Sequence, residues 1–409
     1  MVNSHYVPQL ILKKFSDKLC LYNIRTGEFY EDVSLKRAYS EKGFYDDETE
    51  KNLNLKIESQ FGNLLANKIL EAEKTIKLNR KELFLIKKFL LVSVIRSLGS
   101  IHFMDLEKHY YDHLREFRQL ACDLRGDSEE EKRRAVESVV QPFVEKEIDG
   151  ETVSEYWLRT LNVILDTDGS PEEIIKHPDK TYPAHRWANV IKAGYIAFWD
   201  SGYNHDEFVI TDIGMTSENE KGWNDRTIHN NKKMNFLINL LQKENDETMK
   251  RILAGQIIAQ GYFHENFQMF PISARRMIVL ISPFYKFRYC NSSRYHMPEL
   301  STLTNLVNEN LYCPNENKYV LPLKDGYQPL HPNDKYIYDI KKLTSGETIY
   351  CNELFMDRIN THLGFSSLNK AVKSIVKYKR DNSFPYVPRV DYTQLYKIIE
   401  ERYGGNLNV

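Results

Sequence analysis

The feature of this sequence that most constrains its fold is a change of hydrophobic pattern about half-way along the chain. Between residues 46 and 180, apolar side chains recur every three or four positions, which is the spacing of amphipathic helices. Beyond about residue 185, short apolar runs alternate with turn residues, as in strands. The pattern predicts an α+β protein with a mainly α-helical N-terminal half, which follows a small β-hairpin, and a strand-containing second half.

The predicted helices follow a short N-terminal segment with signals of its own. Ser4–Phe15 reads SHYVPQLILKKF, and Pro8 suits the first turn of a helix, where a missing N–H costs nothing. Two strand-like runs, 19–24 and 29–33, then flank a turn and predict a β-hairpin. Residues 34–45 are expected to form an irregular connector.

Further elements are expected from local signals. The acidic stretch 46–49 marks a helix start, and a long helix is expected from Lys81 past Gly99 to about Leu114. The polar segment 213–233 is expected to be a surface loop. Strands are expected within 187–199, 207–212, 267–273, 276–281, 319–323 and 336–340, and helices at 300–311 and 392–403.

The predicted elements fall into two parts. Residues 1–315 are interpreted as one α+β domain, with a helical part at about 46–180 and a mixed strand and helix part at about 185–315. Residues 316–409 are interpreted as a C-terminal extension of short strands and helices. No repeat divides the chain further.

The composition excludes some classes of protein. The 56 Lys and Arg residues almost cancel the 57 Asp and Glu residues, so no global positive field exists to bind nucleic acid, and any such site has to be a local patch. The five cysteines have no zinc-site spacing and suggest reduced thiols. No apolar run is long enough to span a bilayer. We therefore expect a cytoplasmic protein with no membrane partner.

Several separated motifs, taken in order, resemble one family. They are His5-Tyr6-Val7-Pro8-Gln9, the following Leu-Tyr-Asn hairpin, Ile57-Glu58, Arg96, Phe208-Val209-Ile210-Thr211-Asp212, Phe270-Pro271-Ile272-Ser273, and the helix at Asn305–Tyr312. This order resembles the bacterial "HYVPQ" proteins of domain of unknown function 4238, over about residues 3–315. Thr211-Asp212-Ile213-Gly214 stands where that family more usually has Ser-Asp-Asn-Pro. The resemblance supports a choice of site residues and implies no activity.

The candidate site residues are His5, Gln9, Glu58, Arg96 and Asp212, which we expect to approach one another when the N-terminal segment packs on the later strands. His5 with Gln9 is interpreted either as a polar pair in which His5 is a catalytic acid, a catalytic base or a metal ligand, or as an anchor for the segment. Arg96 lies on an apolar helix face, where an arginine needs a partner or a function.

Glu58 and Asp212 are candidate ligands of a divalent metal such as magnesium, as in phosphoryl-transfer sites. The alternative is that Glu58 is a surface carboxylate and Asp212 caps a strand. Arg96 with His102 has the spacing seen in metal-independent ribonucleases, but this spacing is common by accident. His109 and His113 lie on one helix face and could share a metal, but a solvated helix face is the favoured interpretation. No nucleotide-binding, hydrolase or kinase motif is present.

These residue types predict a nuclease-like or phosphoryl-transfer effector of a bacterial toxin or phage-defence system, acting on nucleic acid. The alternative is a non-catalytic ligand-sensing or protein-interaction module whose polar cluster is structural. A partner protein or a homo-oligomer is compatible with both hypotheses.

Overall fold

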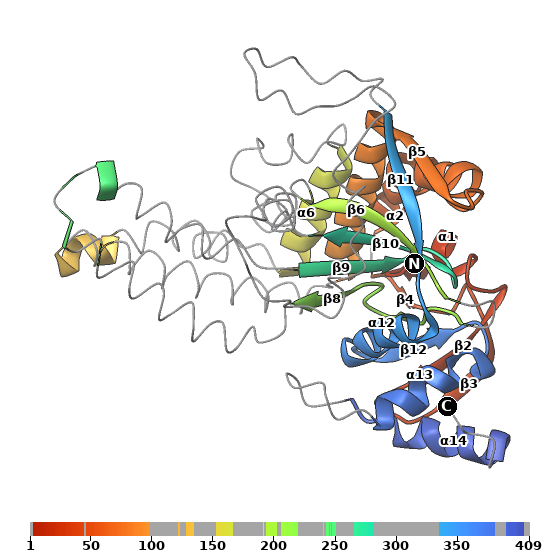
Figure 1. The fold of residues 1–409 in the computed structure, drawn as a ribbon. Helices are drawn as coiled ribbons and strands as arrows, with labels where there is room; N and C mark the ends of the chain where they lie inside the picture. Colours follow the sequence, from red (N-terminus) through yellow and green to blue (C-terminus); the bar gives the residue numbers. More distant parts are fainter. Residues whose placement is uncertain are drawn as a thin grey trace.

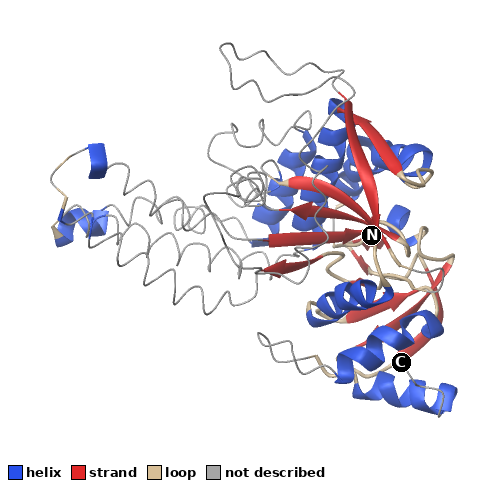
Figure 2. Cartoon of the chain, viewed as in Figure 1, coloured by secondary structure: helices blue, strands red, loops and turns tan. Residues whose placement is uncertain are grey.

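A computed structural model of the chain describes residues 3–44, 46–97, 128–134, 153–166, 194–202, 206–219, 266–281, 335–380 and 390–404, with a few isolated positions besides. Helices and sheets occur together, and helices dominate the first half after a small hairpin (Figures 1 and 2). The predicted α+β class is therefore confirmed.

A six-stranded sheet forms the middle of the described structure, in the order β5-β11-β6-β10-β9-β8. Its strands are β5 (Thr75–Asn79), β6 (Tyr195–Asp200), β8 (Thr216–Asn219), β9 (Asn266–Pro271), β10 (Arg276–Ile281) and β11 (Lys335–Lys342). Only the pairing of β11 with β6 is parallel; the others are antiparallel.

Both faces of this sheet are buried, because alternate residues of its strands belong to different hydrophobic cores. On β10, Ile278 and Leu280 face one core, whereas Met277, Val279 and Ile281 face the other. Side chains alternate across a strand, so a continuous apolar run is what a strand covered on both faces requires. The all-apolar sequence of β10 after Arg276 thus places it in the centre of the molecule.

The first core is covered by helices from the N-terminal half (Figure 2). These are α2 (Asp47–Leu53), the π-helical turn η1 (Asn54–Glu58), α3 (Ser59–Leu64), the π-helical turn η2 (Leu65–Ile69), a helix at residues 80–97, and α6 (Val153–Asp166). The Asp46 carboxylate caps α2 by accepting a hydrogen bond from the Thr49 amide, which confirms the acidic helix start. The helix at 80–97 is the described part of the long helix expected from Lys81.

The second core lies between the other face of the central sheet and a four-stranded sheet with order β3-β2-β12-β7. That sheet contains β2 (Lys18–Asn23), β3 (Phe29–Ser34), β7 (Ile210–Thr211) and β12 (His362–Phe365). Helices α12 (Ser345–Asp357), α13 (Leu368–Arg380) and α14 (Thr393–Tyr403) pack against it in the lower part of Figure 1. The predicted hairpin is confirmed as β2 and β3, and α14 confirms the predicted C-terminal helix.

The N-terminal segment forms β1 (Asn3–His5) and the short helix α1 (Gln9–Leu12). β1 pairs antiparallel with β4 (Ser40–Lys42), so the irregular connector expected at 34–45 contains a strand. Likewise, β8 lies within the loop expected at 213–233. Both strands are short and polar, and each exists because a partner offers free backbone groups, which hydrophobic periodicity does not reveal.

Strands from both sides of residue 315 meet in each of the two larger sheets. β11 pairs with β5 and β6, and β12 pairs with β2 and β7. The division into a domain at 1–315 and an extension at 316–409 stays a prediction, but the backbone pairing is continuous across it. Among the described residues, no helix is long and apolar enough to cross a membrane.

Candidate functional site

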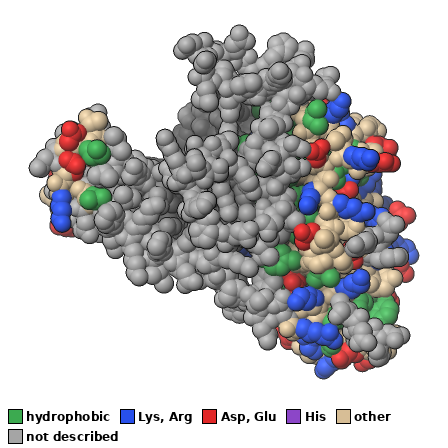
Figure 3. Space-filling model, in the orientation of Figure 1, with side chains coloured by type: hydrophobic (Ala, Val, Ile, Leu, Met, Phe, Trp, Pro, Cys, Tyr) green, Lys and Arg blue, Asp and Glu red, His purple; other side chains and the backbone are tan. Residues whose placement is uncertain are grey.

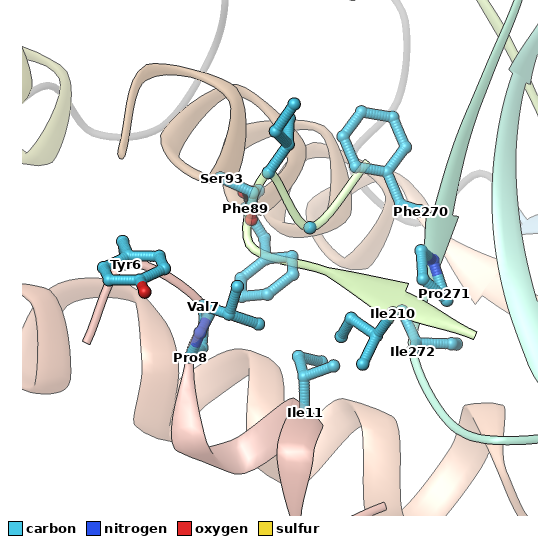
Figure 4. A pocket seen from close by; sticks show the side chains of 12 residues that line it. Tyr6, Val7, Pro8, Ile11, Phe89, Ser93, Ile210, Phe270, Pro271 and Ile272 are labelled. Atoms are coloured by element: carbon cyan, nitrogen blue, oxygen red, sulfur yellow. Dashed lines mark hydrogen bonds between the residues drawn. The ribbon is translucent and has the colours of Figure 1, made fainter. Parts of the chain in front are cut away.

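Three of the motifs singled out in the sequence meet around one small pocket (Figure 4). Its walls come from the N-terminal segment, the helix at 80–97, the turn after β7, and the end of β9. The lining residues are Tyr6, Val7, Pro8, Ile11, Phe89, Ser93, Ile210, Ile213, Gly214, Phe270, Pro271 and Ile272. The centre of a water-sized sphere can occupy only about 20 Å³ of it, which is room for a single water molecule. The pocket is therefore a packed junction between the N-terminal segment Ser4–Phe15, which we call the leader, and the elements around it; we call it the leader junction.

The turn after β7 shows what glycine does at position 214, where the family that this chain resembles more usually has proline. Gly214 has φ +69°, its amide donates to the Thr211 carbonyl at 2.9 Å, and a Cβ there would lie 3.5 Å from Val7. Proline has φ near −65° and no N–H. Glycine at this position thus gives the turn a geometry that a proline cannot adopt, and brings it against the leader.

His5 and Gln9 form a hydrogen-bonded pair, as the four-residue spacing suggested. His5 is buried at the end of β1, with its Nε2 atom 2.9 Å from Gln9 Nε2 and 3.1 Å from the Leu35 carbonyl oxygen. When Nε2 carries a proton it donates to Leu35, and when it carries a lone pair it accepts from the Gln9 amide. These contacts fix the N-terminal segment to the connector after β3.

Asp212 binds the loop that leads into β12. Its Oδ1 accepts from the Asn360 amide at 3.1 Å, and its Oδ2 accepts from the Thr361 amide and hydroxyl, each at 2.7 Å. Its own amide donates to the His362 carbonyl at 3.1 Å. The side chain is buried and both its oxygens are satisfied. We call Asp212 with residues 360–362 the Asp212 tie.

The Asp212 charge is felt across the leader junction. Burial raises the pKa of Tyr6 above its usual range, and the negative charges of Asp212 and Glu41 raise it further. Burial likewise raises the pKa of Tyr39, with Asp212 adding to the effect. The Tyr39 hydroxyl donates to the Ile210 carbonyl at 2.9 Å. The N-terminal segment and the Asp212 tie are thus close enough to interact electrostatically.

Glu58 and Arg96 form an ion pair between η1 and the helix at 80–97. The Arg96 side chain is 1 % exposed and the Glu58 side chain 17 % exposed, so only the glutamate reaches the surface of the described residues. Trp157 of α6 donates to the Ile95 carbonyl at 2.7 Å, which braces the helix one residue before Arg96. The ion pair with Glu58 bears out the expectation that Arg96 is paired on its apolar helix face.

A π-helical turn positions Glu58. In η1 the Ser59 amide bonds to the Asn54 carbonyl, five residues back, instead of four. The π-helical turn contains one residue more than an α-helical turn. Positions 50 and 58, which are eight apart in the sequence, are therefore related like positions seven apart in a regular α-helix, which is about two full turns. Glu50 of α2 and Glu58 therefore share one face of the helical stretch.

Most of the chain matches one described family. The family described as "Protein of unknown function (DUF4238)" matches residues 3–358. The chain belongs to the DUF4238 family. The match extends beyond the limit of about residue 315 expected from the motifs, and includes β11 and α12. No curated protein and no solved structure matches the chain.

Glu50 is the functional candidate of this DUF4238 chain that sequence reasoning missed. Its Oε2 atom is buried and has no hydrogen-bond partner among the described residues. Burial raises the pKa of the Glu50 carboxyl; the positive charge of Arg96 opposes that rise and the negative charge of Glu58 adds to it. The only signal in the sequence was its spacing from Glu58, and a regular 3.6-residue period places the two about 80° apart.

The five predicted residues fall into three separate sets of contacts. His5 pairs with Gln9, Glu58 pairs with Arg96, and Asp212 holds residues 360–362. Among the described residues, no group of three or more His, Cys, Asp or Glu side chains is arranged to hold a metal ion. The pairing of Glu58 with Asp212 around a divalent metal stays a prediction, and both Asp212 oxygens already have protein donors. His102, His109, His113 and the helix at 305–312 lie outside the described residues.

Of the three sets, the one containing Glu50, Glu58 and Arg96 has the widest chemical capacity. A guanidinium group binds phosphate or carboxylate oxygens. A carboxyl group with a raised pKa keeps its proton to a higher pH than a free carboxyl group does, and can act as a general acid. We call these three residues the Glu50 centre.

Proposed function

We propose that this DUF4238 protein is a nuclease-like or phosphoryl-transfer effector that acts on nucleic acid, with its reaction at the Glu50 centre. The observation that carries the proposal is the buried Glu50 oxygen without a partner, beside the Arg96–Glu58 ion pair. Carboxyl groups with shifted pKa values are concentrated at catalytic sites, and most buried polar atoms that only stabilise a fold have a hydrogen-bond partner.

The proposed roles follow from the chemistry of each group. Arg96 would neutralise a non-bridging oxygen of the scissile phosphate as negative charge builds up there. Glu58, ionised, would take a proton from the attacking water, and Glu50, protonated, would give its proton to the leaving oxygen. One P–O bond forms as the other breaks, and the two carboxyl groups exchange protonation states. Substrate would approach past Glu58, the only one of the pair that is partly exposed.

A divalent metal such as magnesium would contribute Lewis acidity and would orient the phosphate. Glu58 supplies a carboxylate for it, and Asp212 is committed to the loop at 360–362. The assay below is therefore run with and without Mg²⁺.

The test is cleavage of labelled RNA and DNA by the purified full-length chain. We expect the wild type to produce fragments, and Glu50→Gln to slow the reaction at least about 100-fold, because general acid catalysis contributes that much. Glu48→Gln is the matched control, since Glu48 is exposed on the same helix. Its rate should equal that of the wild type.

Two results would overturn the proposal. One is the absence of cleavage of any nucleic acid, with Mg²⁺ or Mn²⁺ and at any pH between 5 and 9. The other is cleavage by Glu50→Gln at the wild-type rate. If the protein is a toxin or a defence effector, expression of the wild type should slow bacterial growth, and expression of Glu50→Gln should not.

A second candidate function, a non-catalytic binding module, is favoured by the leader junction and the Asp212 tie. There His5 Nε2 and both Asp212 carboxylate oxygens are hydrogen-bonded within the chain, as in structural residues. Thermal stabilisation by a small ligand without turnover would support this alternative. The leader junction holds one water at most, so such a ligand would have to open it.

A further inference from the structure

Arg96 is the only cation of the Glu50 centre, so the proposed reaction depends on where its guanidinium lies. On the face of the molecule shown in Figure 3, positive and negative side chains of the described residues are interspersed and give no field of one sign. A phosphate is then held by a few accurately placed donors. The Arg96 side chain is 1 % exposed, so the residues that pack around its helix decide its position.

The leader packs against the helix at 80–97 just before Arg96. Phe89 and Ser93 of that helix line the leader junction together with Tyr6 and three other leader residues (Figure 4). Positions 89, 93 and 96 are spaced by four and three residues, so they lie on one side of the helix. The leader therefore supports the side of the helix that carries Arg96.

A row of aromatic rings forms a second connection between the leader and this helix. The ring centres of Tyr6 and Phe44 are 6.0 Å apart, with an interplanar angle of 60°. Those of Phe44 and Trp157 are 5.3 Å apart, with an angle of 67°. Edge contacts at such separations are a favoured arrangement of aromatic pairs. We call Tyr6, Phe44 and Trp157 the aromatic row.

Hydrogen bonds fix both ends of the aromatic row. At the leader end, β1 pairs with β4, and the Tyr6 amide donates to the Tyr39 carbonyl at 3.1 Å. At the other end, the buried Trp157 indole N–H donates to the Ile95 carbonyl at 2.7 Å. Ile95 directly precedes Arg96 in the chain. A displacement of Trp157 therefore moves the backbone that carries the guanidinium.

We propose that Tyr6 is a positioning residue of the Glu50 centre and sets the place of Arg96 through the aromatic row. A smaller side chain at position 6 would leave a gap beside Phe44, and the neighbouring rings would shift towards it. The inference rests on the proposed function for the reaction that Arg96 serves. The connection itself can be measured without any substrate.

The first measurement is a double-mutant cycle of folding stability, made by urea denaturation of the full chain. Tyr6→Leu removes the ring at one end of the row, and Glu58→Gln removes the partner of Arg96. Distant sites without shared partners usually give additive losses. We expect the double variant to lose less than the sum, because the broken row has already weakened the ion pair. The effect of Glu58→Gln on the unfolding equilibrium constant should be at least about threefold smaller in the Tyr6→Leu background.

Two further variants serve as controls in the same cycle. Tyr6→Phe keeps the ring and should behave as the wild type does when combined with Glu58→Gln. Phe365→Leu removes a buried ring from the second core, away from the row, and its loss should add to that of Glu58→Gln.

The second measurement detects the position of Arg96 through the ionisation of Glu50. Burial raises the pKa of Glu50; the positive charge of Arg96 opposes that rise and the negative charge of Glu58 adds to it. If Arg96 withdraws in Tyr6→Leu, the pKa of Glu50 rises further. The stability difference from the matching Glu50→Gln variant should then level off at a higher pH than in the wild type. The expected shift is about half a pH unit, as for a cation that withdraws by about 1 Å from about 4 Å at an effective dielectric constant of about 20.

Several results would overturn the inference. They are additive losses for Tyr6→Leu with Glu58→Gln, the same coupling for Phe365→Leu, altered behaviour of Tyr6→Phe in the cycle, and an unchanged pH profile in Tyr6→Leu. If Tyr6→Leu does not fold, Trp157→Phe, which removes the N–H donor to Ile95, takes its place in both measurements with the same expected results. Coupling without nucleic-acid cleavage by the wild type would overturn the proposed function alone, whereas cleavage with additive losses would overturn this inference alone.

Discussion

Asp212 is a buried carboxyl group and Glu50 is a half-buried one with a buried oxygen, and their hydrogen bonding differs in one decisive respect. Asp212 accepts three hydrogen bonds from Asn360 and Thr361, and all its acceptor atoms are used. Glu50 keeps a buried oxygen without a partner among the described residues, next to an ion pair. A carboxylate whose oxygens all accept hydrogen bonds stabilises the fold. A buried carboxyl oxygen without a hydrogen-bond donor disfavours the ionised form, which raises the pKa of the group and leaves it available for proton transfer. Burial alone therefore does not distinguish a structural acid from a candidate catalytic one.

The largest expected effect on stability is at the Asp212 tie. Asp212→Ala leaves two backbone amides and one hydroxyl without an acceptor, and should lower the free energy of unfolding by about 3 kcal/mol. Urea denaturation of the full chain measures the loss. Asp17→Ala, at an exposed aspartate, is the control and should change little. A loss at Asp212 no larger than that of the control would show that the tie is not structural.

The next effect concerns the ion pair of the Glu50 centre. Glu58→Gln keeps the shape of the side chain but leaves the buried Arg96 without its ionised partner, which should cost about 2 kcal/mol. Part of the loss is recovered because Glu50 ionises in its place. The double variant with Glu50→Gln should therefore be less stable than the sum of the two single effects predicts. Additive losses would show that Glu50 does not interact with Arg96.

Glu50→Gln alone should change stability at pH 7 by less than about 1 kcal/mol, in the stabilising direction, because it removes an ionisable group whose charged form is disfavoured by burial. Its pH dependence is the sharper measurement. Burial raises the pKa of Glu50 in the folded state above the usual 4.5, so the folded protein holds a proton that the unfolded chain releases. Wild-type stability should therefore fall, relative to Glu50→Gln, as pH rises above 4.5. A constant difference between the two across that range would contradict the raised pKa.

The smallest effect is expected at His362, within the Asp212 tie. Its contribution to stability depends on pH in the direction opposite to that of Glu50. Burial lowers the pKa of His362 below 6.5; the charge of Asp212 opposes this and that of Arg25 adds to it. The unfolded chain then binds a proton more readily than the folded one, so stability should fall as pH drops below 6.5. Urea denaturation at pH 7.5 and pH 5.5 should show a larger drop for the wild type than for His362→Gln. An equal drop in both would exclude this contribution.

Where one residue's local chemistry decides the structure, the sequence was sufficient to predict it. The cap at Asp46, the hairpin at 19–33, the apolar strand β10 and the pair of His5 with Gln9 all follow from spacing and residue type. β4 and β8 did not follow, because a short polar strand is defined by its partner.

The candidate site was predicted only in part, for a similar reason. The partner of Arg96 was among the chosen residues, but Glu50 was not. A π-helical turn, which no local motif marked, brings Glu50 and Glu58 to one face. The contacts of Asp212 join positions almost 150 apart, so a single sequence gives no indication of them.

The position of β11 in the central sheet affects how this protein is made. β11 lies between β5 and β6, although some 135 residues separate it in sequence from the end of β6. A ribosome releases β5, β6, β9 and β10 long before β11, so during synthesis two strands expose backbone groups that no neighbour yet occupies. Such edges bind chaperones and promote aggregation until they are covered. A chain truncated before residue 335 would keep the helices of the Glu50 centre but not the complete sheet on which they rest.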